Sequence, residues 1–148
     1  MTEYKVKVYQ NKTEWYNSKD QLHRLDGPAI EWADGDKWWY LNGQLHRLDG
    51  PAFTLVNGHK EWYLNGQRHR EDSPAIEWAN GDKSWYLNGQ LHREDGPAVE
   101  WANGDKSWYL NGKELTDLYF LERNKVELTL EEIADKFNID INQLKIKK

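Results

Sequence analysis

The sequence contains no cysteine and a single methionine among its 148 residues. The absence of cysteine excludes a disulfide framework and any chemistry that depends on a thiolate. No apolar run approaches the roughly 18 residues that a membrane-spanning helix requires. The N-terminal segment, Met-Thr-Glu-Tyr-Lys, lacks the apolar stretch of a signal peptide. We therefore expect a cytoplasmic protein that has no membrane partner.

Basic residues are fewer than acidic ones, whereas large aromatic residues are abundant. The formal net charge is −5, and residues 22–112 hold 14 acidic against 9 basic side chains. Because nucleic-acid affinity depends on clustered lysine and arginine, duplex nucleic acid is not an expected partner. The nine tryptophans and eight tyrosines indicate that aromatic stacking supplies much of the core.

One segment of eight residues occurs four times at a constant spacing of 23 residues. Its first copy reads Leu-His-Arg-Leu-Asp-Gly-Pro-Ala, and the copies begin at Leu22, Leu45, Arg68 and Leu91. A second repeated segment ends in Trp-Tyr-Leu-Asn-Gly and begins at Lys37, Lys60, Lys83 and Lys106. Residues 13–17 resemble the same Trp-Tyr strand as a degenerate half-repeat. A fixed period of this length is typical of stacked repeat proteins.

Each repeat has the pattern of a β-hairpin. Residues 29–33 alternate small or polar with large apolar side chains, which is strand periodicity, and residues 37–41 form the second expected strand. Asp34-Gly35 between them predicts a type I′ turn, which needs a positive φ at both central residues. A longer link from Asn42-Gly43 to Pro51 carries a turn at each end and returns the chain to the next repeat.

These patterns predict a mostly β protein in which 23-residue hairpins stack into one elongated antiparallel sheet. Residues 1–21 supply N-terminal strands and the half-repeat, residues 22–113 the four repeats, and residues 114–148 a C-terminal cap. In the cap, Thr129 and Glu132 form a capping box before a short helix at about residues 130–137. Ile133 and Phe137 share one face of that helix, and we expect the cap to shield the open end of the sheet.

The repeat resembles a known family. Asn-Gly-Gln-Leu-His, then Gly-Pro-Ala, then Glu-Trp-Ala-Asn-Gly-Asp within a 23-residue period is similar to the MORN repeat, over residues 13–112. The similarity is closer to variant MORN-like repeats that are frequent in bacteriophage proteins, because Arg-Glu-Asp-Gly-Pro-Ala stands where the usual repeat has His-Gly-x-Gly. The resemblance implies a twisted sheet of successive hairpins that serves binding rather than catalysis.

Comparison of the internal copies separates scaffold residues from candidate binding residues. Residues identical in all copies, such as Trp39 and its equivalents, serve the stacking that all copies share. The residue before this tryptophan differs between copies, and as Trp38 it shares a strand face with Tyr40. Residues 53–59 replace Ile-Glu-Trp-Ala-Asn-Gly-Asp by Phe-Thr-Leu-Val-Asn-Gly-His. The candidate partner-binding residues are Trp38, Tyr40, Phe53, Leu55, His59 and Glu61.

Each of these candidates also has a structural interpretation. Trp38 can instead pack on the N-terminal strand at residues 4–9. The altered segment at residues 53–59 can reflect neutral drift within a tolerant array.

The repeated histidines and carboxylates do not predict a catalytic or metal site. Equivalent residues of successive hairpins lie ~10 Å apart, whereas ligands of one Zn²⁺ lie about 3–4 Å from each other. Copies of one motif also have equivalent environments, which prevents the separation of pKa values that an acid/base pair needs. The Arg and Asp of each His-Arg-x-Asp segment are expected to pair and to bind the linking turn. We expect no catalytic residue, metal or cofactor.

The function favoured by the sequence is a non-enzymatic scaffold that binds a protein partner. The bacteriophage resemblance adds the hypothesis of an inhibitor of a host defence or metabolic protein in the host cytoplasm. A second hypothesis is a small-ligand binder that stacks a nucleotide signal or a sugar on Trp, Tyr and Arg, near residues 53–59 or at an oligomer interface. A hydrolase is a third, although no nucleophile motif is present. Unpaired sheet edges would also allow a homo-oligomer.

Overall fold

The computed structural model describes residues 3–116, 132 and 134–135. The chain divides into two compact units, Met1–Leu115 and Thr116–Lys148. Within the described part of the first unit every regular element is a β-strand, and Glu132, Ala134 and Asp135 of the second unit are helical. The rest of the predicted helix and of the C-terminal cap lies outside the described residues. No helix in the described part is long and apolar enough to cross a membrane.

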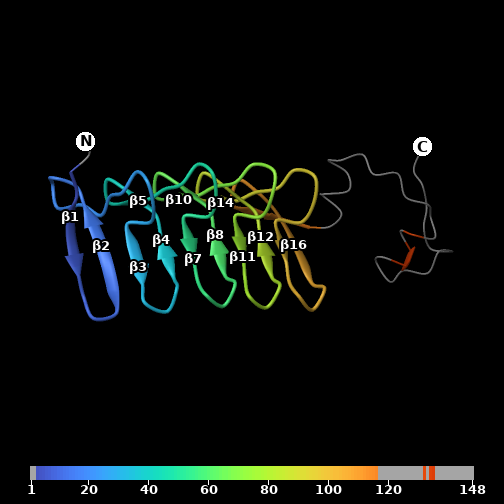
Figure 1. The fold of residues 1–148 in the computed structure, drawn as a ribbon. Helices are drawn as coiled ribbons and strands as arrows, with labels where there is room; N and C mark the ends of the chain where they lie inside the picture. Colours follow the sequence, from blue (N-terminus) through green and yellow to red (C-terminus); the bar gives the residue numbers. More distant parts are fainter. Residues whose placement is uncertain (1–2, 117–131, 133, 136–148) are drawn as a thin grey trace. The chain divides into compact units, whose positions relative to one another are not determined.

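Eleven strands form one antiparallel sheet whose spatial order follows the chain. Within each repeat a turn joins two strands, and the second strand of one repeat pairs with the first strand of the next (Figure 1). The predicted edge-to-edge stacking of hairpins is therefore confirmed. The strands are β1 (Lys5–Val8), β2 (Lys12–Tyr16), β3 (Ile30–Trp32), β4 (Lys37–Trp38), β7 (Phe53–Thr54), β8 (Lys60–Glu61), β11 (Ile76–Glu77), β12 (Lys83–Ser84), β15 (Val99–Glu100), β16 (Lys106–Leu110) and β17 (Lys113–Leu115).

The predicted second strand at residues 37–41 is interrupted at Trp39. The backbone of Trp39 donates its N–H to Ala52 of the next repeat and accepts from His46, which turns the chain out of the main sheet. Three small two-stranded sheets follow at the strand ends opposite the turns that contain Gly35, Gly58, Gly81 and Gly104 (Figure 1). They pair β5 (Tyr40–Leu41) with β6 (Gln44–Leu45), β9 (Tyr63–Leu64) with β10 (Gln67–Arg68), and β13 (Tyr86–Leu87) with β14 (Gln90–Leu91).

The type I′ turn occurs at Asn-Gly in these small hairpins, and its prediction at Asp34-Gly35 was wrong. Leu41 pairs directly with Gln44, and both Asn42 and Gly43 have positive φ, 50° and 81°. At Asp34-Gly35 only the glycine has a positive φ, 108°. There the loop has an additional residue, because the N–H of Trp32 bonds to the carbonyl of Asp36. This is the arrangement of a type I turn followed by a bulge.

Small buried residues allow the repeats to stack closely. Each repeat contributes one completely buried alanine, and these are Ala29, Ala52, Ala75 and Ala98, all at 0% exposure. Each alanine carbonyl accepts from the backbone N–H of a tryptophan in the preceding unit, at 2.7–2.9 Å, for the tryptophans Trp15, Trp39, Trp62 and Trp85. The guanidinium groups of the linking turns then cover the same tryptophan rings at 3.9–4.2 Å. The identical residues therefore form the contacts between repeats.

The histidine near the start of each repeat also binds the Asn-Gly turn near the end of the same repeat. Nδ1 of His23 accepts from the backbone N–H of Asn42 at 3.1 Å, and the other three copies repeat this bond at 3.1–3.2 Å. The predicted Arg–Asp pair is present at Arg24, Arg47 and Arg93, where Nε donates to the aspartate at 2.8–3.0 Å. Both features support a structural role for the recurring His-Arg-x-Asp segment.

The first edge strand of the sheet is exposed. β1 pairs with β2, and all four of its residues are solvent-exposed, with Val8 at 78%. Self-association through this edge stays a prediction.

Candidate functional site

One face of the main sheet carries a continuous line of ring contacts. Trp32 lies 5.6 Å from Trp38, which stacks on Phe53 at 5.1 Å with an interplanar angle of 29°. Phe53 meets the edge of His59 at 5.8 Å, and His59 lies 6.1 Å from Trp78. We call Trp32, Trp38, Phe53, His59 and Trp78 the aromatic row.

The strand register explains why these residues meet. Trp38 is directly opposite Ile30 on one side and Phe53 on the other, and Phe53 is opposite Glu61. Residues opposite each other in antiparallel strands share a face and lie close together. The register therefore brings four of the predicted residues, Trp38, Phe53, His59 and Glu61, to one place.

Trp38 is half-buried within the row, and its ring contacts are with Trp32 and Phe53 rather than with strand 4–9. The indole Nε1 atoms of Trp32 and Trp38 are buried and have no hydrogen-bond acceptor among the described residues. These rings therefore contribute apolar area and stacking rather than directed hydrogen bonds.

A hydrogen-bond cluster lies beside the row and is centred on Glu61. Its Oε1 is 2.8 Å from Nε2 of His59, and its Oε2 accepts from the Tyr63 hydroxyl at 2.8 Å and from Nε of Arg68 at 2.9 Å. An ionised carboxylate only accepts hydrogen bonds, so Nε2 of His59 carries the proton in this contact. The Arg68 guanidinium lies 5.8 Å from the ring of Tyr63 and 5.5 Å from that of Tyr86.

The cluster alters the acidity of its members. Burial by itself raises the pKa of the Glu61 carboxyl, but hydrogen bonds from His59, Tyr63 and Arg68 outweigh burial and hold this pKa below its ordinary value. Burial, and then the bond to the Glu61 carboxylate, raise the pKa of Tyr63 to about 12. Burial lowers and the Glu61 carboxylate raises the pKa of Arg68, with a net rise. At neutral pH the Glu61 carboxylate and the Arg68 guanidinium therefore remain a charged pair.

The sequence comparison missed Arg68 and Tyr63 as members of this cluster. Arg68 stands where the other repeats have leucine, so the same comparison of copies could have found it. Tyr63 is identical in all copies and had no such signal. A similar cluster occurs at Glu14, which pairs with Lys12 at 2.6 Å and accepts from the Tyr16 hydroxyl. At both sheet positions the carboxylate accepts from the tyrosine two residues later and pairs with a basic side chain.

A shallow hollow adjoins the end of the row. It has a volume of about 390 Å³ and is lined by Leu55, Asn57, His59, Trp78, Ala79 and Asn80. Trp78 is 36% exposed, so its ring is accessible from this hollow. Leu55 is thus near His59, whereas Tyr40 lies half-buried in β5 without a ring contact to the row among the described residues.

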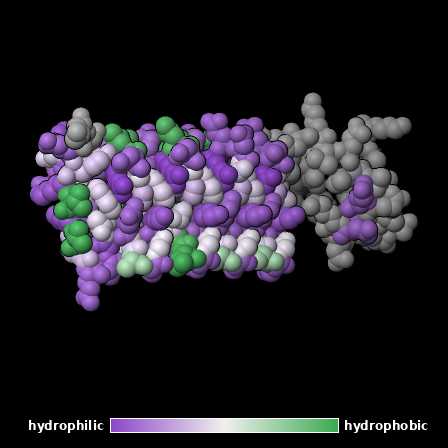
Figure 2. All heavy atoms as spheres, viewed as in Figure 1, coloured by the Kyte–Doolittle hydropathy of each residue, from purple (hydrophilic) through white to green (hydrophobic). Residues whose placement is uncertain are grey.

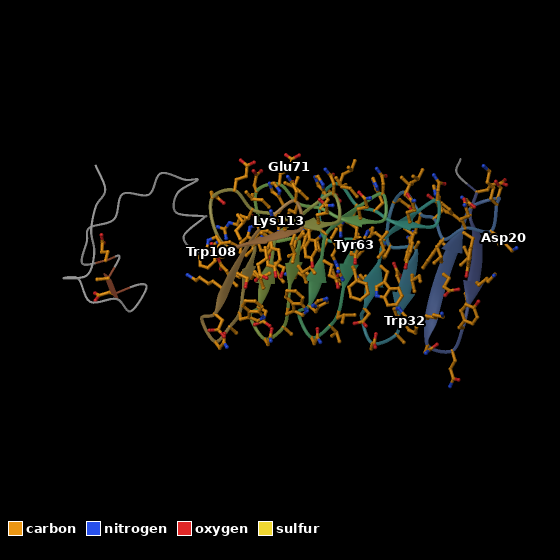
Figure 3. The ribbon with its side chains drawn as sticks, turned by 180° about the vertical axis from the view of Figure 1, so that it is seen from behind. Asp20, Trp32, Tyr63, Glu71, Trp108 and Lys113 are labelled. Carbon is orange, nitrogen blue, oxygen red and sulfur yellow. The ribbon has the colours of Figure 1, made fainter. Side chains whose placement is uncertain are left out.

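A second hollow lies among the linking turns. It has a volume of about 560 Å³, and its lining includes Trp39, Arg47 and the exposed side chains of Leu25 and Leu48. Glu71 takes the position of Leu48 one repeat later, and Figure 3 shows it toward the opposite end of the hairpins from Trp32. Elsewhere the visible surface is mostly hydrophilic, with hydrophobic residues in small separate patches (Figure 2). The linking turns and the aromatic row are therefore two distinct surfaces.

Among the described residues, no group of three or more His, Cys, Asp or Glu side chains is placed to hold a metal ion. The chain matches no known protein-family model, and no curated protein matches it either.

Proposed function

We propose that this protein is a non-enzymatic scaffold that binds a protein partner through the aromatic row. The continuity of the row carries the proposal, because each of its five rings contacts the next across strands of three successive repeats. Aromatic side chains supply large contact areas at a low cost in conformational entropy, and tryptophan is enriched at the centres of protein interfaces.

The Glu61 cluster supports this role by holding one end of the row in place. His59 is bound through Nε2 and is only 12% exposed at its side chain, so its ring has a fixed orientation between Phe53 and Trp78. A rigid surface loses little entropy on binding, which favours affinity. The residues that differ between copies thus form a preorganised patch.

We further propose that the repeat is MORN-like and that the partner is a host protein. The period, the Asn-Gly turns and the Trp-Tyr strands are features that MORN-like repeats share. Variants of this repeat are frequent in bacteriophage proteins, and on that basis the partner is a host protein that this protein inhibits in the host cytoplasm.

Binding through the row can be tested with two tryptophans at the same repeat position. Trp78 ends the row, whereas Trp101 is its equivalent one repeat later, with similar exposure, 36% and 41%, but no ring contact to the row. Proteins retained by the immobilised wild type from bacterial lysate are identified, and the affinity of the purified partner is then measured. Trp78→Ala should weaken binding about 30-fold, since interface hot spots contribute about 2 kcal/mol or more. Trp101→Ala should bind as the wild type does.

Equal loss in both variants would assign binding to another surface, and unchanged binding in both would remove the row from the interface. Trp38→Ala in the interior of the row provides a second measurement, with circular dichroism as the control for folding.

A second candidate function is binding of a small ring-shaped ligand such as a nucleotide or a sugar. The hollow at His59 and Trp78 favours it, because a ligand ring could stack on the exposed indole. Thermal-shift measurements with cyclic nucleotides, ADP-ribose derivatives and sugars test this candidate. A rise in melting temperature that Trp78→Ala removes would support it, and the absence of any shift would favour the protein partner.

A further inference from the structure

An arginine–glutamate pair links the turn and the first strand in three of the four repeats. Nη1 of Arg24 donates to Glu31 at 3.1 Å, Arg70 to Glu77 at 3.1 Å, and Arg93 to Glu100 at 2.9 Å. In every repeat the same arginine also donates to the carbonyl of the turn proline, at 3.1–3.3 Å. The guanidinium is therefore held in one position that faces a strand carboxylate.

The repeat at residues 45–67 keeps this arginine but lacks the carboxylate. Arg47 covers the ring of Trp39 at 4.2 Å, pairs with Asp49 at 2.8 Å and donates to the carbonyl of Pro51. Thr54 stands at the glutamate position, and its hydroxyl donates to the carbonyl of Lys37 at 3.3 Å. Among the described residues, Arg47 has no strand carboxylate as a partner.

The strand register surrounds this position with further positive charge. Across the sheet, acidic and basic residues alternate at this level, since Glu31 is opposite Lys37 and Lys60 is opposite Glu77. Thr54 interrupts the alternation and lies directly between Lys37 and Lys60. Neither lysine forms an ion pair among the described residues, and both are exposed. Two lysines thus flank the position at which the other repeats pair this arginine with a carboxylate.

We propose that Arg47, Lys37 and Lys60 form a binding site for a carboxylate supplied from outside the chain. In the other repeats the glutamate side chain is 33–42% exposed, so its position is accessible from solvent. The chemistry is that of the internal pairs, because a guanidinium presents N–H donors in a geometry that matches a carboxylate. The carboxylate can be a glutamate or aspartate side chain of a peptide, or a free small carboxylic acid.

The site is independent of the proposed function. Thr54 and Lys37 alternate along their strands with Phe53 and Trp38, so their side chains point away from the aromatic row. A change at Thr54 therefore tests the carboxylate site without altering the row.

The internal copies provide variants that remove and create the site. Thr54→Glu restores the residue of the other repeats and should supply the carboxylate from within the chain, so external carboxylates should no longer bind near Arg47. Glu77→Thr should create a second site at Arg70, because residue 77 lies directly between Lys60 and Lys83 in the sheet. Amide and Arg Nε chemical shifts are followed by NMR during titration with glutarate at physiological ionic strength.

The wild type should show saturable shifts at Arg47 and Thr54, which Thr54→Glu abolishes, while Glu77→Thr adds shifts at Arg70. Equal shifts in the wild type and Thr54→Glu, or none in the wild type with any carboxylate probe, would overturn the site. A peptide with one central glutamate, and its glutamine counterpart, identify the source. Tenfold tighter binding of the glutamate peptide than of glutarate indicates a peptide ligand, and equal affinity indicates a free acid.

Discussion

Removing the carboxylate of Glu61 should destabilise the protein unless its cationic partner is removed as well. Three donors, from His59, Tyr63 and Arg68, converge on this side chain, which is 13% exposed. In Glu61→Ser they lose their common acceptor, and a half-buried guanidinium lacks its charge partner. Removing one partner of a fully buried ion pair costs about 3–5 kcal/mol. Arg68 is 39% exposed and can bind water instead, so we expect Glu61→Ser to lower the free energy of unfolding by about 2–3 kcal/mol.

The next repeat shows how the loss can be compensated. There Ser84 and Leu91 occupy the positions of Glu61 and Arg68, and Ser84 is buried. Glu61→Ser combined with Arg68→Leu reproduces this pairing and should recover much of the stability. The coupling energy between the two substitutions should reach about 1.5–3 kcal/mol, in the range found for residues that share a hydrogen-bond network.

Urea denaturation followed by tryptophan fluorescence measures all four members of this cycle. A constant m-value verifies that the native and unfolded states remain comparable. A free energy of unfolding of Glu61→Ser within about 0.5 kcal/mol of the wild-type value, the range of an ordinary surface substitution, would contradict this role of the carboxylate. Additive effects of the two substitutions on the free energy of unfolding would likewise contradict it, because the carboxylate and the guanidinium would then not interact.

Three further predictions concern acidity, turn geometry and packing. The pKa of Glu61 is lower in the folded protein than its ordinary value of 4.5. The contribution of its carboxylate to stability is therefore complete above pH 4.5 and is lost as the pH falls through the folded pKa. The midpoint of urea unfolding, measured as a function of pH, should fall less at acidic pH in Glu61→Gln than in the wild type. Gly43→Ala should lower the free energy of unfolding, measured by thermal denaturation, by about 1–2 kcal/mol because the φ of Gly43 is 81°. Gly43→Asn should lower it less, since asparagine adopts positive φ more readily than alanine does. Trp38→Ala should lower the free energy of unfolding in urea by about 2–4 kcal/mol, less than the loss of a fully buried tryptophan, because its ring packs on two others. A smaller loss than that of Leu48→Ala, an exposed control, would contradict this packing.

The period and the turn residues were sufficient to predict the hairpin sheet, because both act over short distances along the chain. Alternating residues identify strands, and Gly or Asn marks the positions where φ is positive. The type of turn was harder to predict. Asp34-Gly35 and Asn42-Gly43 look alike in sequence, but the loop at Gly35 has an additional residue, which removes the type I′ geometry.

The break at Trp39 could not be predicted from its own strand. It results from a hydrogen bond to Ala52, which belongs to the next repeat. The members of the Glu61 cluster illustrate the same limitation. Comparison of copies identified Glu61 and His59 as unusual, but only the folded chain brings Arg68 within 2.9 Å of the carboxylate.

By itself, the sequence determined that four similar segments fold into antiparallel hairpins and that Trp38, Phe53, His59 and Glu61 differ from their equivalents. The tertiary structure decided that these unusual residues meet on one face, while Thr54 leaves Arg47 without a strand carboxylate on the other. The physical reason is the register between repeats. Backbone hydrogen bonds between neighbouring repeats set this register, and a shift of one residue would move every side chain to the opposite face.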